Sequence, residues 1–247
     1  MNRLLIALCA CLWAVTGHAD TVSVAVAANF SAPMQKLAAA FEQSTGHKAK
    51  VSLGSTGRFY AQIKNGAPFQ VFLAADDETP AKLEQEGLGV QGTHFTYAVG
   101  QLALWSAQAG LVDPQGQVLK TGAFPKIALA EPKLAPYGQA AVQAMTQLGL
   151  LHALQPRWVL GENIAQTYQF VATGNAPLGF VALSQVYAEG RFTQGSGWIV
   201  PADLYTPIRQ GALLLNAGKD QPAAQAFMRF LQSPTARAII RAHAYKN

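Results

Sequence analysis

The sequence predicts an α/β protein with two lobes, each a mainly parallel sheet flanked by helices. Short apolar runs typical of strands buried on both faces alternate with segments of helical period. This alternation occupies residues 20–97 and begins again within residues 98–203. Two more helices are expected over residues 222–231 and 234–243. We therefore expect lobe 1 to comprise residues 20–97 plus 204–247, and lobe 2 to comprise residues 98–203.

In the first lobe, apolar runs mark the strands, and proline or glycine marks the helix ends. Residues 21–28 form a continuous apolar run, which predicts a strand buried on both faces. Pro33 stands near the start of the next segment, where proline suits the first turn of a helix. The other expected elements are strands at 50–53, 71–74 and 208–215 and helices that end near residues 65 and 87.

A long extended run over residues 97–106 is expected to lead into the second lobe. Shorter apolar runs follow it, and segments of helical period come after two of them. The expected strands lie at 127–130, 157–160 and 178–182, and the expected helices lie at 139–148 and 164–173. Such alternation predicts parallel strands joined by right-handed crossovers.

The first 19 residues are predicted to be a secretory signal peptide. A positive start at Arg3 is followed by a short apolar run and by small residues before Asp20. Both cysteines, Cys9 and Cys11, lie in this segment, so the mature chain is expected to be stable without disulfides. The sequence therefore predicts a periplasmic protein that is secreted through this segment.

The charge distribution argues against a nucleic-acid partner. The full chain has a formal net charge of +5, and removal of Arg3 leaves 17 basic and 13 acidic residues. The basic residues are scattered, without a run or a cluster interleaved with aromatic residues. A mild positive charge favours a small anion without specifying where that anion binds.

Four loops at the carboxyl ends of expected strands carry the candidate binding groups. The most distinctive is GSTG at residues 54–57, where the hydroxyls of Ser55 and Thr56 meet free backbone N–H groups at a helix N-terminus. The helix dipole favours an anion there. Three comparable loops follow the expected strands at 21–28, 127–130 and 157–160. Ligands of open α/β sheets bind at such strand ends, so we expect an anion site between the lobes.

Five sequence blocks occur along the chain in the order found in one known family. They read VAVAANF, GSTGRFYAQIKNGAPFQVFLAAD, ALAEPKLAPYGQAA, GENIAQ and NAPLGFVALSQV, at residues 24–30, 54–76, 128–141, 161–166 and 175–186. The chain resembles the periplasmic molybdate-binding components of ABC importers. The resemblance implies a type II periplasmic binding fold, with molybdate or tungstate held between two lobes and delivered to a permease at the inner membrane. It also implies a monomer that has no cofactor and no catalytic activity.

The resemblance further implies which residues contact the oxyanion. Asn29 would donate through its amide N–H₂ and its backbone N–H, and Thr56, with Ser55 beside it, through a hydroxyl. Tyr137 and Ile164 would each donate a backbone N–H. The secondary candidates are Ala28, Ser31, Arg58 and Ala182. Several relatives carry a tyrosine hydroxyl at the position of Ala182, so that contact is expected to be absent here.

The chemistry of these donors separates the tetrahedral oxyanions in part. Molybdate and tungstate are unprotonated near neutral pH and accept hydrogen bonds only. Phosphate keeps a proton that needs an acceptor, and none of the main candidates is a carboxylate, so phosphate is disfavoured. Sulfate has the same charge and hydrogen-bonding character as molybdate and stays open as the alternative. An iron complex is disfavoured, because Tyr137 and Tyr168 have no adjacent tyrosine.

Catalysis and metal binding have less support in the sequence. A secreted phosphate or sulfate ester hydrolase could use Ser55 or Thr56 as its nucleophile, but residues 54–57 contain no His, Cys or Lys to activate a hydroxyl. The acidic cluster at residues 76–78 is expected to cap the helix that follows it. The histidines of the mature chain show no metal-ligand spacing, and no direct protein ligand to a metal is expected.

Overall fold

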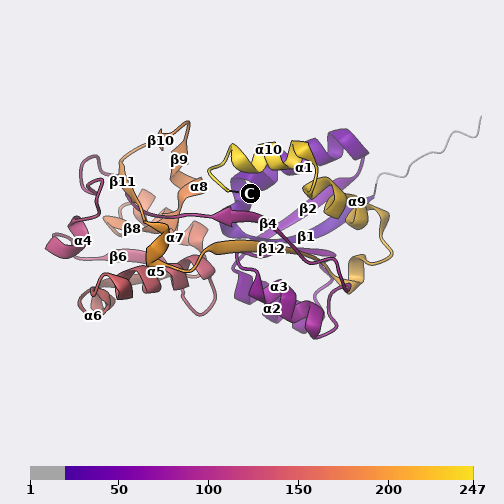
Figure 1. Cartoon of the computed structure of the whole chain (residues 1–247), viewed down its shortest axis with the longest axis horizontal. Helices are drawn as coiled ribbons and strands as arrows, with labels where there is room; N and C mark the ends of the chain where they lie inside the picture. The colour runs from indigo at the N-terminus through magenta and orange to yellow at the C-terminus, as the bar shows by residue number, and fades with distance from the viewer. Residues whose placement is uncertain (1–19, 247) are drawn as a thin grey trace, which may run out of the picture.

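The computed structural model describes residues 20–246 as two α/β lobes that lie side by side along the long axis of the molecule (Figure 1). Each lobe is built on one five-stranded sheet. The expected signal peptide, residues 1–19, lies outside the described residues, as does residue 247. Across residues 20–246, no helix is long and apolar enough to cross a membrane.

The sheet of the first lobe has the strand order β2-β1-β3-β12-β4. Its strands are β1 (Thr21–Ala27), β2 (Lys48–Gly54), β3 (Val71–Leu73), β4 (Phe95–Gly100) and β12 (Ile208–Leu214). β2 and β3 pair with β1 in parallel, whereas β12 is antiparallel to both β3 and β4. All strands except β12 therefore share one direction, and the expectation of a mainly parallel sheet is confirmed.

Helices cover both faces of this sheet, as amphipathic spacing predicts. They are α1 (Ser31–Thr45), α2 (Thr56–Lys64), α3 (Glu78–Gln85), α9 (Pro222–Leu231) and α10 (Pro234–Arg241). α1 buries Met34, Leu37 and Phe41, which recur three or four residues apart, in one core with α9 and α10. α2 and α3 lie on the opposite face (Figure 1). They share a separate core there, which includes Phe59 and Leu83.

The sheet of the second lobe repeats this plan in the order β11-β5-β8-β6-β7. Its strands are β5 (Leu102–Ser106), β6 (Ile127–Ala130), β7 (Trp158–Gly161), β8 (Leu178–Ala182) and β11 (Ser196–Ile199). β6 is parallel to β7 and β8, whereas β5 is antiparallel to β8 and β11. In each sheet, the strand that opposes the others is the first one reached after the chain enters from the other lobe.

Two longer helices cover opposite faces of this second sheet. They are α5 (Pro136–Gln147) and α7 (Ile164–Ala172). The second lobe has two hydrophobic cores, and α5 packs in the larger one while α7 contributes most of its buried residues to the smaller one. The shorter elements are α4 (Val118–Thr121), α6 (Leu151–Leu154), α8 (Leu183–Val186), the strands β9 (Tyr187–Ala188) and β10 (Arg191–Phe192), and the 3₁₀ turns η1 (Ala28–Phe30), η2 (Gln155–Arg157), η3 (Ala202–Leu204) and η4 (Asn216–Gly218).

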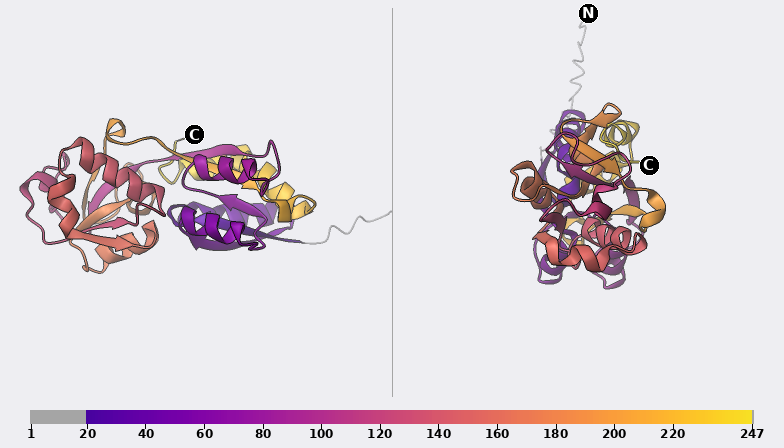
Figure 2. Two further views of the ribbon diagram at one scale, coloured as in Figure 1. Left: turned by 90° about the horizontal axis from the view of Figure 1, so that it is seen from below. Right: turned by 90° about the vertical axis from the view of Figure 1, so that its left-hand side faces the viewer.

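The chain crosses between the lobes twice, once at Gln101 and once through residues 200–207. The two crossings are tied together, because Leu102 N donates to Tyr205 Oη at 3.1 Å and Val200 N donates to Leu102 O at 3.0 Å. The connection between the lobes is narrower than either lobe (Figure 2). Few backbone torsions therefore need to change for one lobe to rotate against the other.

Two sequence-based expectations for the second lobe were wrong in their boundaries. The expected run over residues 97–106 is two strands in different sheets, because β4 pairs with β12 and β5 pairs with β8. α5 begins at Pro136 and not at residue 139, because proline fits the first turn and needs no N–H there. This earlier start places Tyr137 within the first turn of α5.

Candidate anion-binding site

A small pocket lies where the carboxyl ends of strands from both lobes meet, and its cavity of about 10 Å³ has room for roughly one water-sized molecule. Its lining residues are Ala27, Ala28, Asn29, Gly54, Ser55, Thr56, Ala75, Ala135, Pro136, Tyr137, Asn163 and Ile164. They belong to the last residues of β1 and β2 and to the segments that follow β1, β2, β3, β6 and β7. The candidate loops therefore converge on one small space between the lobes.

The lobes touch beside this pocket. Gly57 N, in the first turn of α2, donates to Leu134 O in the loop before α5 at 2.9 Å. A Cβ atom at position 57 would stand 3.1 Å from Leu134 Cα, which is tighter than an ordinary contact. Glycine at this position therefore allows the backbones of the two lobes to approach closely. The structure is that of a closed cleft.

Ser55 carries a buried hydroxyl with no partner in the described part of the chain. It is the N-cap residue of α2, yet its Oγ accepts no hydrogen bond from the helix and makes none elsewhere. The residue is 3% exposed and lines the pocket. A buried hydroxyl without a partner costs free energy, so this group points to something that binds in the pocket.

Thr56 adds a second hydroxyl at the same helix start. Its Oγ1 accepts a hydrogen bond from Ala75 N at 2.9 Å, which fixes the side chain and leaves the hydroxyl hydrogen for another acceptor. Thr56 is 2% exposed and occupies the first position of α2, where the backbone N–H has no partner within the helix. The first lobe thus presents two hydroxyls and a helix N-terminus.

The second lobe presents the N-terminus of α5. Pro136 occupies the first helical position and has no N–H, so the first donor of the helix is Tyr137 N. A donor in the first turn has no acceptor within its own helix. Gly138 follows, where a Cβ atom would stand 2.1 Å from Ala130 O, so only glycine lets α5 start this close to β6.

The N-terminus of α7 leaves a different backbone donor available. Asn163 is its N-cap, and Asn163 Oδ1 accepts from Ala165 N at 3.0 Å and from Gln166 N at 3.1 Å. Thr167 N donates to Asn163 O at 3.1 Å. These bonds occupy the donors of the first turn except Ile164 N, and Ile164 is buried against the pocket.

Asn29 lines the pocket, but its amide is used differently from the sequence-based expectation. Asn29 Nδ2 donates to Gln210 Oε1 and to Tyr245 Oη, both at 2.9 Å, so both amide hydrogens are committed within the protein. Asn29 O accepts from Tyr245 Oη at 2.8 Å and from Ser184 Oγ at 3.1 Å. The expected donation from the amide N–H₂ is therefore replaced by these internal bonds, which leaves the backbone N–H as the donor of Asn29 that could still serve a ligand.

Of the four secondary candidates for contact with the oxyanion, one lines the pocket and three do not. Ala28 lines the pocket, whereas Ser31, Arg58 and Ala182 do not. Arg58 Nη1 forms an ion pair with Glu162, which joins the start of α2 in the first lobe to the loop before α7 in the second. Ala182 is fully buried at the end of β8, where its backbone N–H donates to Gln185 Oε1 at 2.9 Å.

Sequence reasoning missed the polar groups that lie behind Asn29. Gln210, Tyr245 and Ser184 all bond to it, from β12, the C-terminal segment and α8. Gln210 had only a weak local signal, because it follows the exposed Arg209 in β12 and only the structure shows that it is fully buried. Tyr245 had none, since it lies 216 residues from its partner.

The phenols near the pocket are neutral at physiological pH. Burial raises the pKa of Tyr97 and of Tyr137 well above the usual range, and it raises the pKa of Tyr245 to about 12. No phenolate therefore forms beside the site near pH 7. Hydroxyls and backbone N–H groups that face one small space can together donate hydrogen bonds to an anion and so replace the water that it loses on binding.

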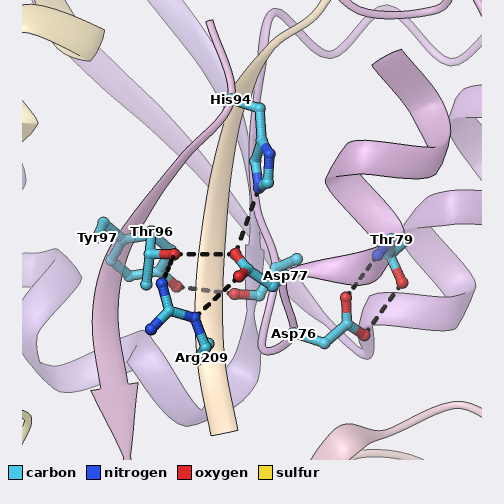
Figure 3. Close-up of polar contacts among 8 residues, drawn as sticks. Asp76, Asp77, Thr79, His94, Thr96, Tyr97 and Arg209 are labelled. Atoms are coloured by element: carbon cyan, nitrogen blue, oxygen red, sulfur yellow. Dashed lines mark hydrogen bonds and ion pairs between the residues drawn. The ribbon is translucent and has the colours of Figure 1, made fainter. Parts of the chain in front are cut away.

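The acidic cluster after β3 caps a helix, as expected from its sequence (Figure 3). Asp76 accepts from Thr79 N at 2.8 Å and from Thr79 Oγ1 at 3.0 Å, and burial raises its pKa. Asp77 pairs with Arg209 at 3.0 Å and with His94 at 3.4 Å. Within residues 20–246, no group of three or more His, Cys, Asp or Glu side chains is placed to share a metal ion.

Comparisons with known proteins agree with this geometry. The family model described as bacterial extracellular solute-binding protein matches residues 22–246. The chain is 59% identical over 245 residues to the molybdate-binding protein ModA of Azotobacter vinelandii, covering 99% of this chain and 97% of that one. It is 50% identical over 233 residues to the molybdate-binding protein ModA of Rhodobacter capsulatus, covering 94% and 90%.

A solved structure supports the same relationship. The periplasmic molybdate-binding protein of Azotobacter vinelandii superposes with a TM-score of 0.88 at 43% sequence identity, covering 92% of this chain and 99% of that chain. The two-lobe fold expected from the resemblance is thereby confirmed. The chain therefore belongs to the family of bacterial extracellular solute-binding proteins, and it is similar over nearly its whole length to the molybdate-binding members of that family.

Proposed function

We propose that the protein captures molybdate or tungstate in the pocket between its lobes and delivers the ion to an ABC permease at the inner membrane. The observation that carries this proposal is the buried Ser55 hydroxyl, which has no protein partner in the described chain and faces a pocket lined by helix N-termini. The names of the similar proteins supply the identity of the ion.

The donor set favours an unprotonated dianion. The groups proposed to bind it are the hydroxyls of Ser55 and Thr56 and the backbone N–H groups of Asn29, Tyr137 and Ile164. All are neutral donors held by helix starts, which can surround a charge without flexible cationic side chains. The lining contains no carboxylate to accept a proton from phosphate. Sulfate stays the alternative ligand, because it differs from molybdate mainly in size.

The same lining supports a binding protein without catalysis. A hydrolase that used Ser55 or Thr56 would need a base beside the hydroxyl. Among residues 20–246, no His, Cys, Lys, Asp or Glu lines the pocket, and Ser55 Oγ has no hydrogen-bond partner. We therefore propose that molybdate is a cargo and that no reaction occurs on it.

The cellular arrangement belongs to the same proposal. Residues 1–19 would direct the chain to the periplasm and be removed, and the mature protein would act as a monomer. Lobe 1 would comprise residues 20–97 plus 204–247 and lobe 2 residues 98–203. The division at residue 97 lies inside β4, a few residues before the chain crosses at Gln101.

Thermal unfolding with a panel of oxyanions tests the proposed ligand. A ligand that binds only the folded protein adds about 2.7 kcal/mol to the free energy of unfolding at 100 times its dissociation constant. For a chain of this size, that raises the melting temperature by roughly 5–10 °C. We expect this rise with molybdate and tungstate and no rise with phosphate, each compared with sodium chloride at equal ionic strength. Equal rises with phosphate, or no rise with any oxyanion, would contradict the proposal.

Arg58→Ala and Glu162→Ala are expected to weaken molybdate binding equally, by less than about fivefold. Both side chains are partly exposed and pair with each other across the cleft, and such pairs contribute about 0–1 kcal/mol. Calorimetric titration at low and high salt measures both effects, which should shrink as salt rises. If Arg58→Ala were far more harmful than Glu162→Ala, the arginine would be contacting the ion directly.

A further inference from the structure

A cluster of buried and partly buried polar side chains lies behind the pocket, and none of the groups proposed to contact the ion is a side chain of this cluster. We call it the tyrosine network, and it consists of Asn29, Tyr97, Tyr137, Ser184, Gln210 and Tyr245. Gln210 is its centre in the first lobe, since its Oε1 accepts from Asn29 and from Tyr97 at 3.0 Å. Its Nε2 donates to Tyr137 Oη at 3.2 Å, which reaches into the second lobe.

Tyr245 reaches this network from the C-terminal end of the chain. The segment after α10 pairs with β4, because Val99 N donates to Lys246 O at 2.7 Å and Lys246 N donates to Val99 O at 3.0 Å. The ring of Tyr245 packs edge-on against Phe30, with centroids 5.3 Å apart, and the residue is 4% exposed. The phenol is thus fixed beside the loop that follows β1.

The hydroxyl of Tyr245 holds Asn29 at two points. It donates to Asn29 O at 2.8 Å and accepts from Asn29 Nδ2 at 2.9 Å, so it fixes both the backbone and the side chain of this pocket residue. Ser184 Oγ lies 3.0 Å from the same phenol oxygen and 3.1 Å from Asn29 O. Ser184 belongs to α8, directly after β8 of the second lobe. One phenol therefore connects the first loop of the site to the opposite lobe.

We propose that Tyr245 is a positioning residue for the anion site, which holds the Asn29 loop in its binding geometry and stabilises the closed cleft through Ser184. This inference rests on the proposed function. The bonds to Ser184 exist only when the lobes are together, so they favour the closed state over the open one. An ion that binds the closed state is then held more tightly by the same factor.

Tyr245→Phe and Ser184→Ala test this role, because each removes one hydroxyl and keeps the rest of the side chain. One net hydrogen bond corresponds to roughly a 3–10-fold change in an equilibrium constant. We expect each variant to bind molybdate about 3–10-fold more weakly in calorimetric titration, mainly through faster release of the ion. The double variant should lose less than the product of the two single losses, since both remove the same contact.

Tyr187→Phe is the matched control. Its hydroxyl donates to Gly190 O at 2.6 Å in the β9–β10 hairpin and bonds to no member of the tyrosine network, so its loss should leave the affinity unchanged. A phenol that only filled the core would lower the melting temperature and leave the affinity intact. If Tyr245→Phe does not fold, Ser184→Ala keeps the phenol in place and still tests the contact between the lobes.

The outcomes separate this inference from the proposed function. If the wild-type protein binds no molybdate, the proposed function fails. If the wild-type protein binds and both folded variants match its affinity and its release rate, the role of Tyr245 fails while the function stands. Losses that multiply fully in the double variant would also overturn the inference, because the two hydroxyls would then act independently.

Discussion

Ser55→Ala is expected to weaken molybdate binding about 10–150-fold while the melting temperature of the empty protein stays the same or rises. A hydrogen bond to a charged group contributes about 1.5–3 kcal/mol, which corresponds to that loss of affinity. Ser55 Oγ is buried without a partner in the described chain, so its removal costs the empty closed protein no hydrogen bond. Calorimetric titration and thermal unfolding measure the two quantities.

Ser106→Ala is the matched control for this variant. Ser106 is equally buried, but its Oγ donates to Pro177 O at 2.6 Å and accepts from Gln108 N at 3.0 Å. Its removal should lower the melting temperature and leave the affinity for molybdate unchanged. The prediction for Ser55 is wrong if Ser55→Ala shows that same pattern, since the hydroxyl would then be serving the fold.

Asn29→Ala is expected to lower both the stability and the affinity. The amide donates to Gln210 and to Tyr245, and its truncation removes one donor to Tyr245 Oη and one of the two donors to Gln210 Oε1, which keeps its bond from Tyr97. Such a loss costs about 2 kcal/mol, or roughly 4–8 °C in the melting temperature of a chain of this size. The affinity should fall as well, because the backbone N–H of residue 29 would no longer be held in place. Thermal unfolding of the empty protein and calorimetric titration with molybdate measure the two losses.

Asn65→Ala provides the comparison for Asn29. Its Nδ2 donates to Ala61 O at 2.8 Å at the exposed end of α2, so its loss should change the melting temperature little. If Asn29→Ala left the stability of the empty protein unaltered and reduced only the affinity, the Asn29 amide would be donating to the ion, as the sequence alone led us to expect.

The location of the candidate pocket could be predicted from the sequence because it depends on local rules. Apolar runs that end in polar, glycine-containing loops mark the carboxyl ends of parallel strands, and those ends meet in a sheet of this class. Ser55, Thr56, Tyr137 and Ile164 each stand at or near a helix start, where the backbone leaves donors free. Neither property depends on distant parts of the chain.

The direction of the Asn29 amide could not be predicted in this way. A side-chain amide turns toward whichever acceptors surround it, and those of Asn29 come from Gln210 and Tyr245, 181 and 216 residues away. The crossing between the lobes at Gln101 could not be predicted for a similar reason. An extended run in the sequence can form one strand of a single sheet or two strands in different sheets. Both features are decided by tertiary contacts that leave no periodic trace in the sequence.

The short elements of the second lobe also escaped prediction. α4 and α6 span four residues each and β9 only two, so no hydrophobic period can develop within them. Helices of this length have little stability of their own and form because the surrounding core holds them. α9, in contrast, was predicted with its observed limits, since Pro222 marks its start and its apolar face recurs over its whole length.

Anomalous diffraction at the molybdenum absorption edge, from crystals grown with molybdate, tests the central claim most directly. We predict one strong peak in the pocket between the lobes. The oxygens around it should lie about 2.7–3.1 Å from Ser55 Oγ, Thr56 Oγ1 and the backbone nitrogens of Tyr137 and Ile164. A peak outside this pocket, or a molybdate whose oxygens are held by Arg58 and other cationic side chains, would contradict recognition by neutral donors at helix starts.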